Sequence, residues 1–341
     1  MIRKALNLAV VALALSLVPA LAGADPVTLR LSYITSDRAD PYQCYVKPFV
    51  EAVNADGAGI VQIKVYFSGA ISPDMTKQAR LVLDGAADLA FVVPGTTPQK
   101  FPDISVLELP GLFRNEREAS LVFARLTAVE ALEGYRKFFV VGAFLPSGET
   151  IHSRKPIASL ADLKGQKIRA DNPIVANTLR KLGALPSLLP INRTMTALSQ
   201  DTLDGVTVAL GGLMAFGLGR VADHHYLLSL GGAPLSLVMN REKLASLLPP
   251  AQEIIRKYSG VWLSKRGAAC FGAKSREIAE KLKADRRRTV VEPSPADLAT
   301  AQKVFASVVD AWAAESPRHR ELLTLVRAEL NKIRSSKETR P

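Results

Sequence analysis

Three apolar stretches near the start of the chain decide the fold: LRLSY at residues 29–33, IVQIKVYF at residues 60–67 and LAFVV at residues 89–93. The first alternates apolar and polar residues, and this period of two predicts a strand. Apolar residues at helical spacing within 46–53 and within 75–82 predict a helix in each gap. The order β-α-β-α-β favours an α/β fold with a mostly parallel sheet flanked by helices.

A similar alternation returns in the second third of the chain. Apolar residues predict strands at 138–144, 167–170, 185–189 and 206–210, with helices between the last three. Asn172 followed by Pro173 is a typical helix start, with the asparagine as N-cap. We therefore expect two α/β lobes in series.

Two further stretches complete the expected organisation. Residues 205–219 carry no charge and hold five glycines, which predicts a buried strand followed by a loop. From about residue 251 onward the pattern is largely helical, with Ser294 as an N-cap candidate.

The composition excludes several classes of protein. Two cysteines and four histidines are too few for a disulfide-built scaffold or a multi-cysteine metal site. Whether Cys44 and Cys270 pair with each other stays open, because they lie far apart in the sequence. The net charge of +12 permits nucleic-acid binding, but the basic residues are not interleaved with aromatic ones. We expect no nucleic-acid partner.

The N-terminus has the pattern of a signal peptide. Arg3 and Lys4 precede an apolar run at 6–17, and small residues follow at 22–24. We expect cleavage before Asp25, an exported periplasmic protein, and no stable membrane insertion after cleavage. A retained signal anchor is the alternative, which the shortness of the apolar run disfavours.

The chain carries none of the common catalytic motifs. It lacks a glycine-rich dinucleotide or phosphate loop, a His-Glu-x-x-His metal motif and a serine nucleophile elbow. The adjacent His224 and His225 would point to opposite faces of a strand, which is poor geometry for one metal ion. We predict no catalytic residues, no metal and no cofactor.

Specific residues then match a known family. SLADLKGQKIR at 159–169 resembles a segment of the solute-binding proteins of tripartite ATP-independent periplasmic (TRAP) transporters, of the dicarboxylate-binding-protein-like family. LGALP at 182–186 and LDG at 203–205 resemble later segments of the same family. The resemblance covers most of the chain after the signal peptide.

The resemblance implies a fold and a function. The fold is a two-lobe periplasmic binding protein (type II-like) with a long helical C-terminal region. The implied boundaries are 25–146 with a return segment at about 235–274 for the first lobe, and 147–234 with 275–341 for the second. The protein would be a monomer that closes around a small carboxylate and delivers it to the TRAP membrane permease subunits.

The same resemblance gives Arg169 the central role, a salt bridge to the ligand carboxylate. A guanidinium presents a rigid fork that matches the two oxygens of a carboxylate. At two positions the chain differs from the family pattern, and these differences narrow the expected class of ligand. Glu149 stands where many dicarboxylate binders have a second arginine, and Thr207 begins a segment that replaces their Glu-Asn-Pro. We expect a monocarboxylate, or a carboxylate whose second group is polar or cationic.

Other ligand-contacting candidates follow from position. Loops after parallel strands line such clefts, although each of these residues has a structural alternative as turn or core. The candidates are Tyr33, Gly95, Thr96, Asn172, Thr207 and Phe216.

Two alternative functions stay open. A binding protein that reports to a membrane kinase would use the same pocket. An enzyme would need an acid–base pair, and Glu149 with His152 is the nearest candidate. Those two side chains share a face only on a helix, whereas residues 151–153 look extended.

Overall fold

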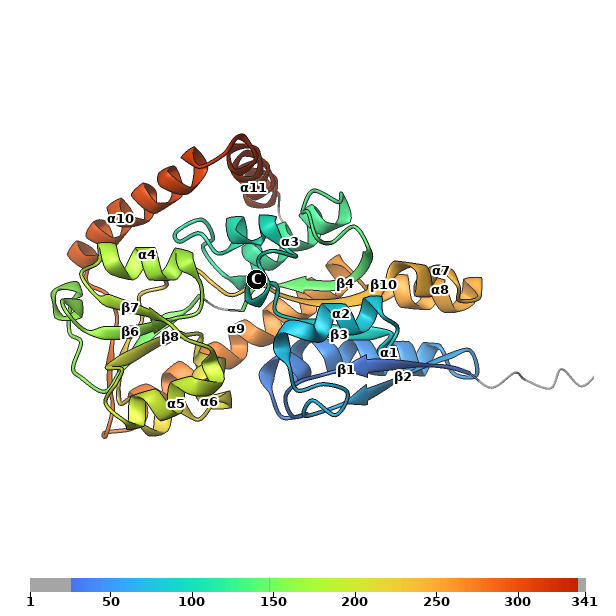
Figure 1. Ribbon diagram of the computed structural model, residues 1–341, viewed down its shortest axis with the longest axis horizontal. Helices are drawn as coiled ribbons and strands as arrows, with labels where there is room; N and C mark the ends of the chain where they lie inside the picture. The colour runs from blue at the N-terminus through green and yellow to red at the C-terminus, as the bar shows by residue number, and fades with distance from the viewer. Residues whose placement is uncertain (1–25, 147, 337–341) are drawn as a thin grey trace, which may run out of the picture.

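The computed structural model describes residues 26–146 and 148–336, and Figure 1 shows them as two sheet-containing lobes side by side. The predicted signal peptide and its cleavage point before Asp25 lie outside the described residues. No helix in the described part of the chain is both long and apolar enough to cross a bilayer.

The first sheet has the strand order β2-β1-β3-β10-β4. β1 pairs in parallel with β2 and β3, whereas β10 runs antiparallel between β3 and β4. The buried apolar residues of these strands pack against helices on both faces. The strands are β1 (Val27–Ser32), β2 (Val61–Tyr66), β3 (Leu89–Val92), β4 (Phe138–Phe144) and β10 (Leu235–Asn240).

The second sheet has the order β11-β9-β5-β8-β6-β7. β6 pairs in parallel with β7 and β8, and β5 runs antiparallel to β8 and β9. The strands are β5 (Thr150–Ser153), β6 (Lys167–Ala170), β7 (Leu185–Leu188), β8 (Gly205–Val208), β9 (His224–Tyr226) and β11 (Thr289–Val291).

These sheets confirm the predicted two-lobe α/β fold and refine it. Both sheets are mixed, because each contains strands that return from another part of the chain. β10 comes back from the second lobe and enters the middle of the first sheet. Local periodicity predicted the individual strands but carries no information on this insertion.

The helices cover the sheets and join the lobes (Figure 1). Asn172 and Ser294 accept hydrogen bonds as N-caps, as predicted. The helices are α1 (Lys47–Asp56), α2 (Gln78–Leu83), α3 (Glu116–Ala128), α4 (Pro173–Lys181), α5 (Ile191–Ser199), α6 (Leu210–Ala215), α7 (Arg241–Ala245), α8 (Pro249–Lys257), α9 (Val261–Ala284), α10 (Pro295–Ala314) and α11 (Pro317–Ser335).

The segment 205–219 differs from the expectation of a strand followed by loop. β8 is followed by the helix α6, whose Leu210 and Leu213 are buried in an apolar cluster. Gly211 lies close to the first lobe, since a Cβ there would be 3.0 Å from the Asp40 carboxylate. The glycines therefore permit close approach here rather than preventing a helix.

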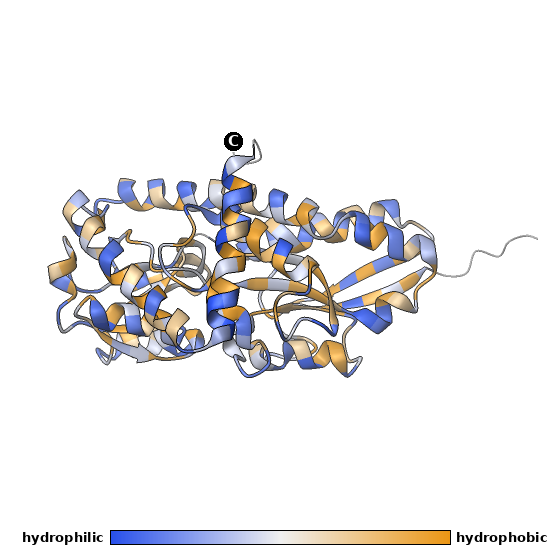
Figure 2. Cartoon of the chain, turned by 90° about the horizontal axis from the view of Figure 1, so that it is seen from above, coloured by the Kyte–Doolittle hydropathy of each residue, from blue (hydrophilic) through white to orange (hydrophobic). Residues whose placement is uncertain are grey.

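Three helices tie the two lobes together. α9 contacts β4 and α3 at one end and β11 and α6 at the other. α10 contacts α4, whereas α11 contacts α3 of the first lobe. Part of the segment 275–341, which we expected with the second lobe, thus lies on the first. Figure 2 shows the C-terminal helix crossing the middle of the molecule, with hydrophilic and hydrophobic residues alternating along it.

Cys44 and Cys270 form a disulfide, which answers the question that spacing left open. The bond joins the short helical turn before α1 to the middle of α9, across 226 residues of sequence. A crosslink that closes so long a loop restricts the unfolded chain. It also anchors α9 on the first lobe.

Candidate functional site

Two backbone carbonyls of neighbouring segments orient the side chain of Arg169. It lies on β6 with only 5% of its surface exposed. Its Nε donates to the Leu189 carbonyl at 2.8 Å, and its Nη1 donates to the Thr207 carbonyl at 3.1 Å. The Thr207 hydroxyl donates in return to the Arg169 carbonyl at 3.2 Å. A guanidinium has five donors, and Nη2 makes no hydrogen bond to any described residue.

Glu149 lies beside this arginine and is itself 96% buried, with 4% of its surface exposed. Its carboxyl is next to the Asp171 carboxyl and the Thr207 hydroxyl, and its Oε2 has no hydrogen-bond partner. Burial raises the pKa of the Glu149 carboxyl well above its usual range. The Asp171 charge raises this pKa further, while Arg169 opposes both. Glu149 therefore tends to hold a proton.

The first lobe contributes Glu108 to the same place. This residue follows a short helical turn at Pro102–Leu107 and is 4% exposed. Its carboxyl lies against Gly95, where a Cβ would be 2.6 Å from Oε1. Burial, and secondly the charge of Asp171, raises the pKa of Glu108 to about 8. Residues of both lobes thus surround Asp171.

Asn172 holds the loop that carries Asp171. Its side-chain oxygen accepts from the Val175 backbone N–H at 2.9 Å, as the cap of α4. Its side-chain nitrogen donates to the Asp171 carboxylate at 3.2 Å. The asparagine therefore positions the acid next to it.

The structure brings together some of the predicted site residues. Arg169, Glu149 and Thr207 form one group, Asn172 adjoins it, and Gly95 lies beside Glu108. We call Arg169, Glu149, Asp171, Thr207 and Glu108 the arginine–carboxyl group.

The other three candidates lie elsewhere in the described structure. Tyr33 is buried in an aromatic cluster with Tyr42, Phe67 and Phe91. Thr96 is exposed, and its hydroxyl donates to the Val93 carbonyl. Phe216 ends α6 and packs against an apolar cluster of the second lobe. No hydrogen bond joins any of the three to the arginine–carboxyl group within the described ranges.

Sequence reasoning missed Asp171 and Glu108. Asp171 directly follows β6, so the rule that nominated Asn172 also applied to it. Glu108 is a single acid inside the apolar run 104–113, which was a usable signal.

His152 belongs to a separate buried group, on β5, which is extended as expected. Its Nδ1 lies 2.9 Å from Nδ1 of His225, and its Nε2 lies 3.1 Å from the Val208 carbonyl. A carbonyl only accepts, so Nε2 carries the proton and Nδ1 accepts from His225. The other nitrogen of His225 then accepts from Arg288 at 3.4 Å. Both His152 nitrogens are thus engaged away from Glu149.

This histidine chain favours neutral imidazoles. Burial lowers the pKa of His152 to about 3, with the neighbouring His225 as the second cause. Burial and then the charge of Arg288 lower the pKa of His225 to about 4. Each imidazole nitrogen of His152 and His225 thus has a hydrogen-bond partner, and we interpret this histidine chain as structural.

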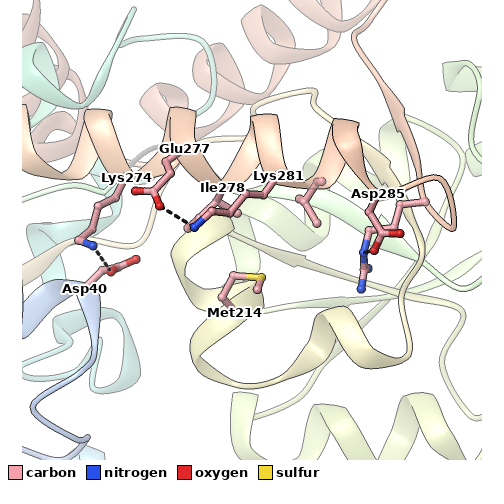
Figure 3. A pocket seen from close by; sticks show the side chains of 9 residues that line it. Asp40, Met214, Lys274, Glu277, Ile278, Lys281 and Asp285 are labelled. Carbon is pink, nitrogen blue, oxygen red and sulfur yellow. Dashed lines mark hydrogen bonds and ion pairs between the residues drawn. The ribbon is translucent and has the colours of Figure 1, made fainter.

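A cavity of about 380 Å³ lies between α6 and α9 (Figure 3); Arg288, the partner of His225, is part of its lining, and no member of the arginine–carboxyl group is. Its charged side chains pair with one another: Lys274 with Asp40 at 3.5 Å and Lys281 with Glu277 at 2.6 Å. None of the predicted site residues lines it. Because its charges are already paired, we place the candidate site at the arginine–carboxyl group instead.

The family comparison matches most of the chain. Residues 31–316 match the sequence model of DctP, described as bacterial extracellular solute-binding protein, family 7.

Curated relatives extend over a similar length. The 2,3-diketo-L-gulonate-binding periplasmic protein YiaO of Escherichia coli is 26% identical over 239 residues, 67% of this chain and 70% of that protein. The ectoine-binding periplasmic protein TeaA of Halomonas elongata is 24% identical over 293 residues, 81% of this chain and 83% of that protein.

Solved structures share the fold. A TRAP solute-binding protein from a marine metagenome, in complex with 3-hydroxybenzoate, has a TM-score of 0.82 and 24% identity. The alignment covers 91% of this chain and 99% of that one. A TRAP solute-binding protein of Rhodoferax ferrireducens, in complex with copurified benzoate, has a TM-score of 0.80 and 24% identity, covering 90% and 98%.

Proposed function

Since the chain belongs to family 7 of the bacterial extracellular solute-binding proteins, we propose that it captures an organic acid and delivers it to a TRAP membrane permease. The acid would bind between the two lobes, in the periplasm, to a monomer. No chemistry on the bound acid is expected.

The observation that carries this proposal is the state of Arg169. Two carbonyls hold its guanidinium in a defined orientation, and Nη2 makes no hydrogen bond to any described residue. A carboxylate accepting from Nη2 would complete the donors of a buried cation, and such charge-assisted bonds are strong where water is excluded. An arginine serving only the fold would have its donors occupied within the protein.

The ligand is expected to carry one carboxylate. Gulonate derivatives, ectoine, benzoate and 3-hydroxybenzoate, named for the relatives and the solved structures, each have a single carboxyl group. A second carboxylate near Glu149 would be repelled by the charge of Asp171, the same charge that raises the pKa of Glu149. Malate or succinate should therefore bind poorly.

Delivery requires the lobes to open and close. The chain crosses between the sheets near Glu149 and near Gly231, where the Glu149 N–H donates to the Gly231 carbonyl at 2.7 Å. We propose these crossings as the hinge, with 25–146 and 235–274 moving against 147–234.

The test combines ligand identification with one substitution. The acid that co-purifies with the mature protein is released by denaturation and identified by mass spectrometry. Thermal unfolding is then followed with a panel of mono- and dicarboxylates. A ligand at a hundredfold excess over its dissociation constant stabilises the folded protein by about 2.7 kcal/mol.

The expected result is stabilisation of the wild type and of Arg180→Ala, but not of Arg169→Ala. Arg180 is an exposed arginine of the same lobe and serves as the matched control. Equal stabilisation of Arg169→Ala would contradict the role of Arg169. The absence of both a co-purified acid and any stabilising acid would contradict the function.

A further inference from the structure

We propose that Glu149, Asp171 and Glu108 form a subsite for a cationic nitrogen, so that the ligand carries an ammonium or amidinium group beside its carboxylate. This inference rests on the proposed function and narrows its substrate class.

The first observation is a buried carboxyl oxygen, Oε2 of Glu149, that has no hydrogen-bond partner among the described residues. Glu149 is 96% buried, and its Oε2 is buried without any hydrogen-bond partner. Leaving such an atom unsatisfied is unfavourable, so native proteins rarely retain one without a role. The carboxyl lies beside Asp171, Thr207 and the Arg169 charge. A ligand group that supplies the missing partner would therefore lie close to these three residues.

The second step is the balance of charge. The arginine–carboxyl group holds three carboxyl groups and a single guanidinium. No ion pair within 4.0 Å joins Arg169 to any of the three among the described residues. Fully ionised, the group would carry two net negative charges, so without a cation Glu149 and Glu108 tend to keep their protons. A cation supplied by the ligand lets these acids ionise and pairs with the charge that ionisation creates, whereas a second anion does not.

The third step is the position of Glu108. This acid comes from the first lobe and lies close enough to Asp171 of the second lobe for the two charges to interact. Two neighbouring carboxyl groups repel each other when both are ionised. A cation between them turns repulsion into attraction from both sides. It would thus favour the closed arrangement of the lobes.

The chemistry of the subsite is that of a hydrogen-bonding cation. Oε2 of Glu149 only accepts when the carboxyl is ionised, and an ammonium or amidinium N–H is a donor. A hydroxyl could also donate, but it would leave the charge excess unchanged. A quaternary ammonium would neutralise charge without filling the missing hydrogen bond.

The experiment compares ligands of one shape that differ only in the cation. The probes are proline, tetrahydrofuroate and cyclopentanecarboxylate, which place an ammonium, an ether oxygen or a methylene at the same ring position. A larger pair is meta-aminomethylbenzoate and meta-ethylbenzoate. The acid that co-purifies is identified as well and is examined for a cationic nitrogen.

We expect the cationic member of a set to bind about 10- to 100-fold more tightly than its neutral partners in calorimetry, the range for one charged hydrogen bond. Glu149→Gln should remove most of that preference, measured within the variant as the ratio of the affinities for the cationic and neutral members. Glu253→Gln, an exposed acid of α8, is the control and should bind like the wild type.

A second measurement does not depend on any variant. In the wild type, binding of the cationic member should release protons near pH 7, since the cation favours the ionised forms of Glu149 and Glu108. Calorimetry in buffers of different ionisation enthalpy measures that release. The neutral members should release none.

The outcomes separate the two proposals. Equal affinity for cationic and neutral members, or a co-purified acid without a cationic nitrogen, overturns the subsite but leaves the organic-acid function standing. Unchanged preference in Glu149→Gln also overturns the subsite. Failure to bind or to co-purify any organic acid overturns the proposed function together with the inference built on it.

Discussion

Two buried polar groups, the histidine chain of the second lobe and the arginine–carboxyl group formed by both lobes, differ in whether their hydrogen bonds are satisfied. In the histidine chain each described nitrogen of His152 and His225 has a partner, and the carbonyl of Val208 fixes the direction of every bond. In the arginine–carboxyl group, Glu149 Oε2 has none and carboxyls outnumber guanidinium. A satisfied network serves the fold, because nothing is left to bind. An unsatisfied one at the same depth calls for a ligand.

The largest effect should come from Arg169→Ala. Removing the guanidinium takes away the charged partner of the ligand and leaves the carboxyl groups without any cation. We expect the affinity for the co-purified acid to fall by at least about 30-fold, in line with the 2–5 kcal/mol typical of a broken buried charge pair. Calorimetry checks this. A loss below tenfold would break the distinction between the two groups.

The next largest effect should come from His225→Ala, and it should fall on stability alone. The substitution leaves only Nδ1 of the buried His152 without a partner, because Arg288 keeps its bonds to Asp285, Ala222 and Gly219, and we expect a cost of about 1–3 kcal/mol of unfolding free energy. Urea unfolding measures that loss, and calorimetry should give unchanged ligand affinity. His224→Ala is the control, because the two adjacent side chains point to opposite faces of β9. A large loss of affinity in His225→Ala would show that the groups act together.

Gly231→Ala tests the crossing between the lobes. Gly231 has φ of 114°, and a Cβ there would be 2.4 Å from the Glu108 carbonyl oxygen. We expect a loss of about 2 kcal/mol and weaker ligand binding, because the crossing and Glu108 must shift. Gly85→Ala is the control. Gly85 has φ of 74°, and a Cβ there would have no atom within 4 Å, so this variant should lose only the free energy of backbone strain. Equal losses in urea unfolding would remove the special role of this contact.

The smallest net effect should be the dependence of stability on pH, because the two groups change stability in opposite directions and partly cancel between about pH 4.5 and 6.5. The histidine pKa values are about 3 and 4 in the folded protein and about 6.5 when unfolded, so stability falls as the pH drops below 6.5. The pKa of Glu108 is raised to about 8, so stability falls as the pH rises from about 4.5 to 8.

Each proton that is bound in only one of the folded and unfolded states changes the unfolding free energy by about 1.4 kcal/mol per pH unit. Urea unfolding across pH 4 to 8 measures both slopes. His225→Ala should weaken the acid slope, and Glu108→Gln should weaken the slope at higher pH. Retention of both slopes in the two variants would contradict this assignment of the titrating groups.

Local sequence patterns predicted most of the separate elements. β4 and β6 have the expected bounds, and Asn172 caps α4, because alternation, helical spacing and capping act over a few residues. The same rules failed at α6, where Gly211 is tolerated through a contact with the distant Asp40. They also could not place β10 within the first sheet.

For the candidate site too, some residues could be nominated from the sequence, whereas their arrangement required the structure. Arg169, Glu149 and Thr207 could be nominated from the chain itself, through a motif and its departures. Their mutual arrangement could not, and neither could the approach of Glu108 from the other lobe. The same positional rule also nominated Tyr33, Thr96 and Phe216. In the fold, Tyr33 packs in an aromatic cluster, Thr96 bonds within a turn and Phe216 packs against an apolar cluster.

The sequence by itself determined the α/β class, the two lobes and most of the individual strands. These follow from periodicity and residue chemistry, which are local. Only the tertiary structure decided that Cys44 meets Cys270, that β10 joins the first sheet and that Glu149 lies near both Arg169 and Asp171 while Glu108 approaches Asp171 from the other lobe. Those juxtapositions arise from packing between residues far apart in the chain, and no local pattern encodes which distant partners will meet.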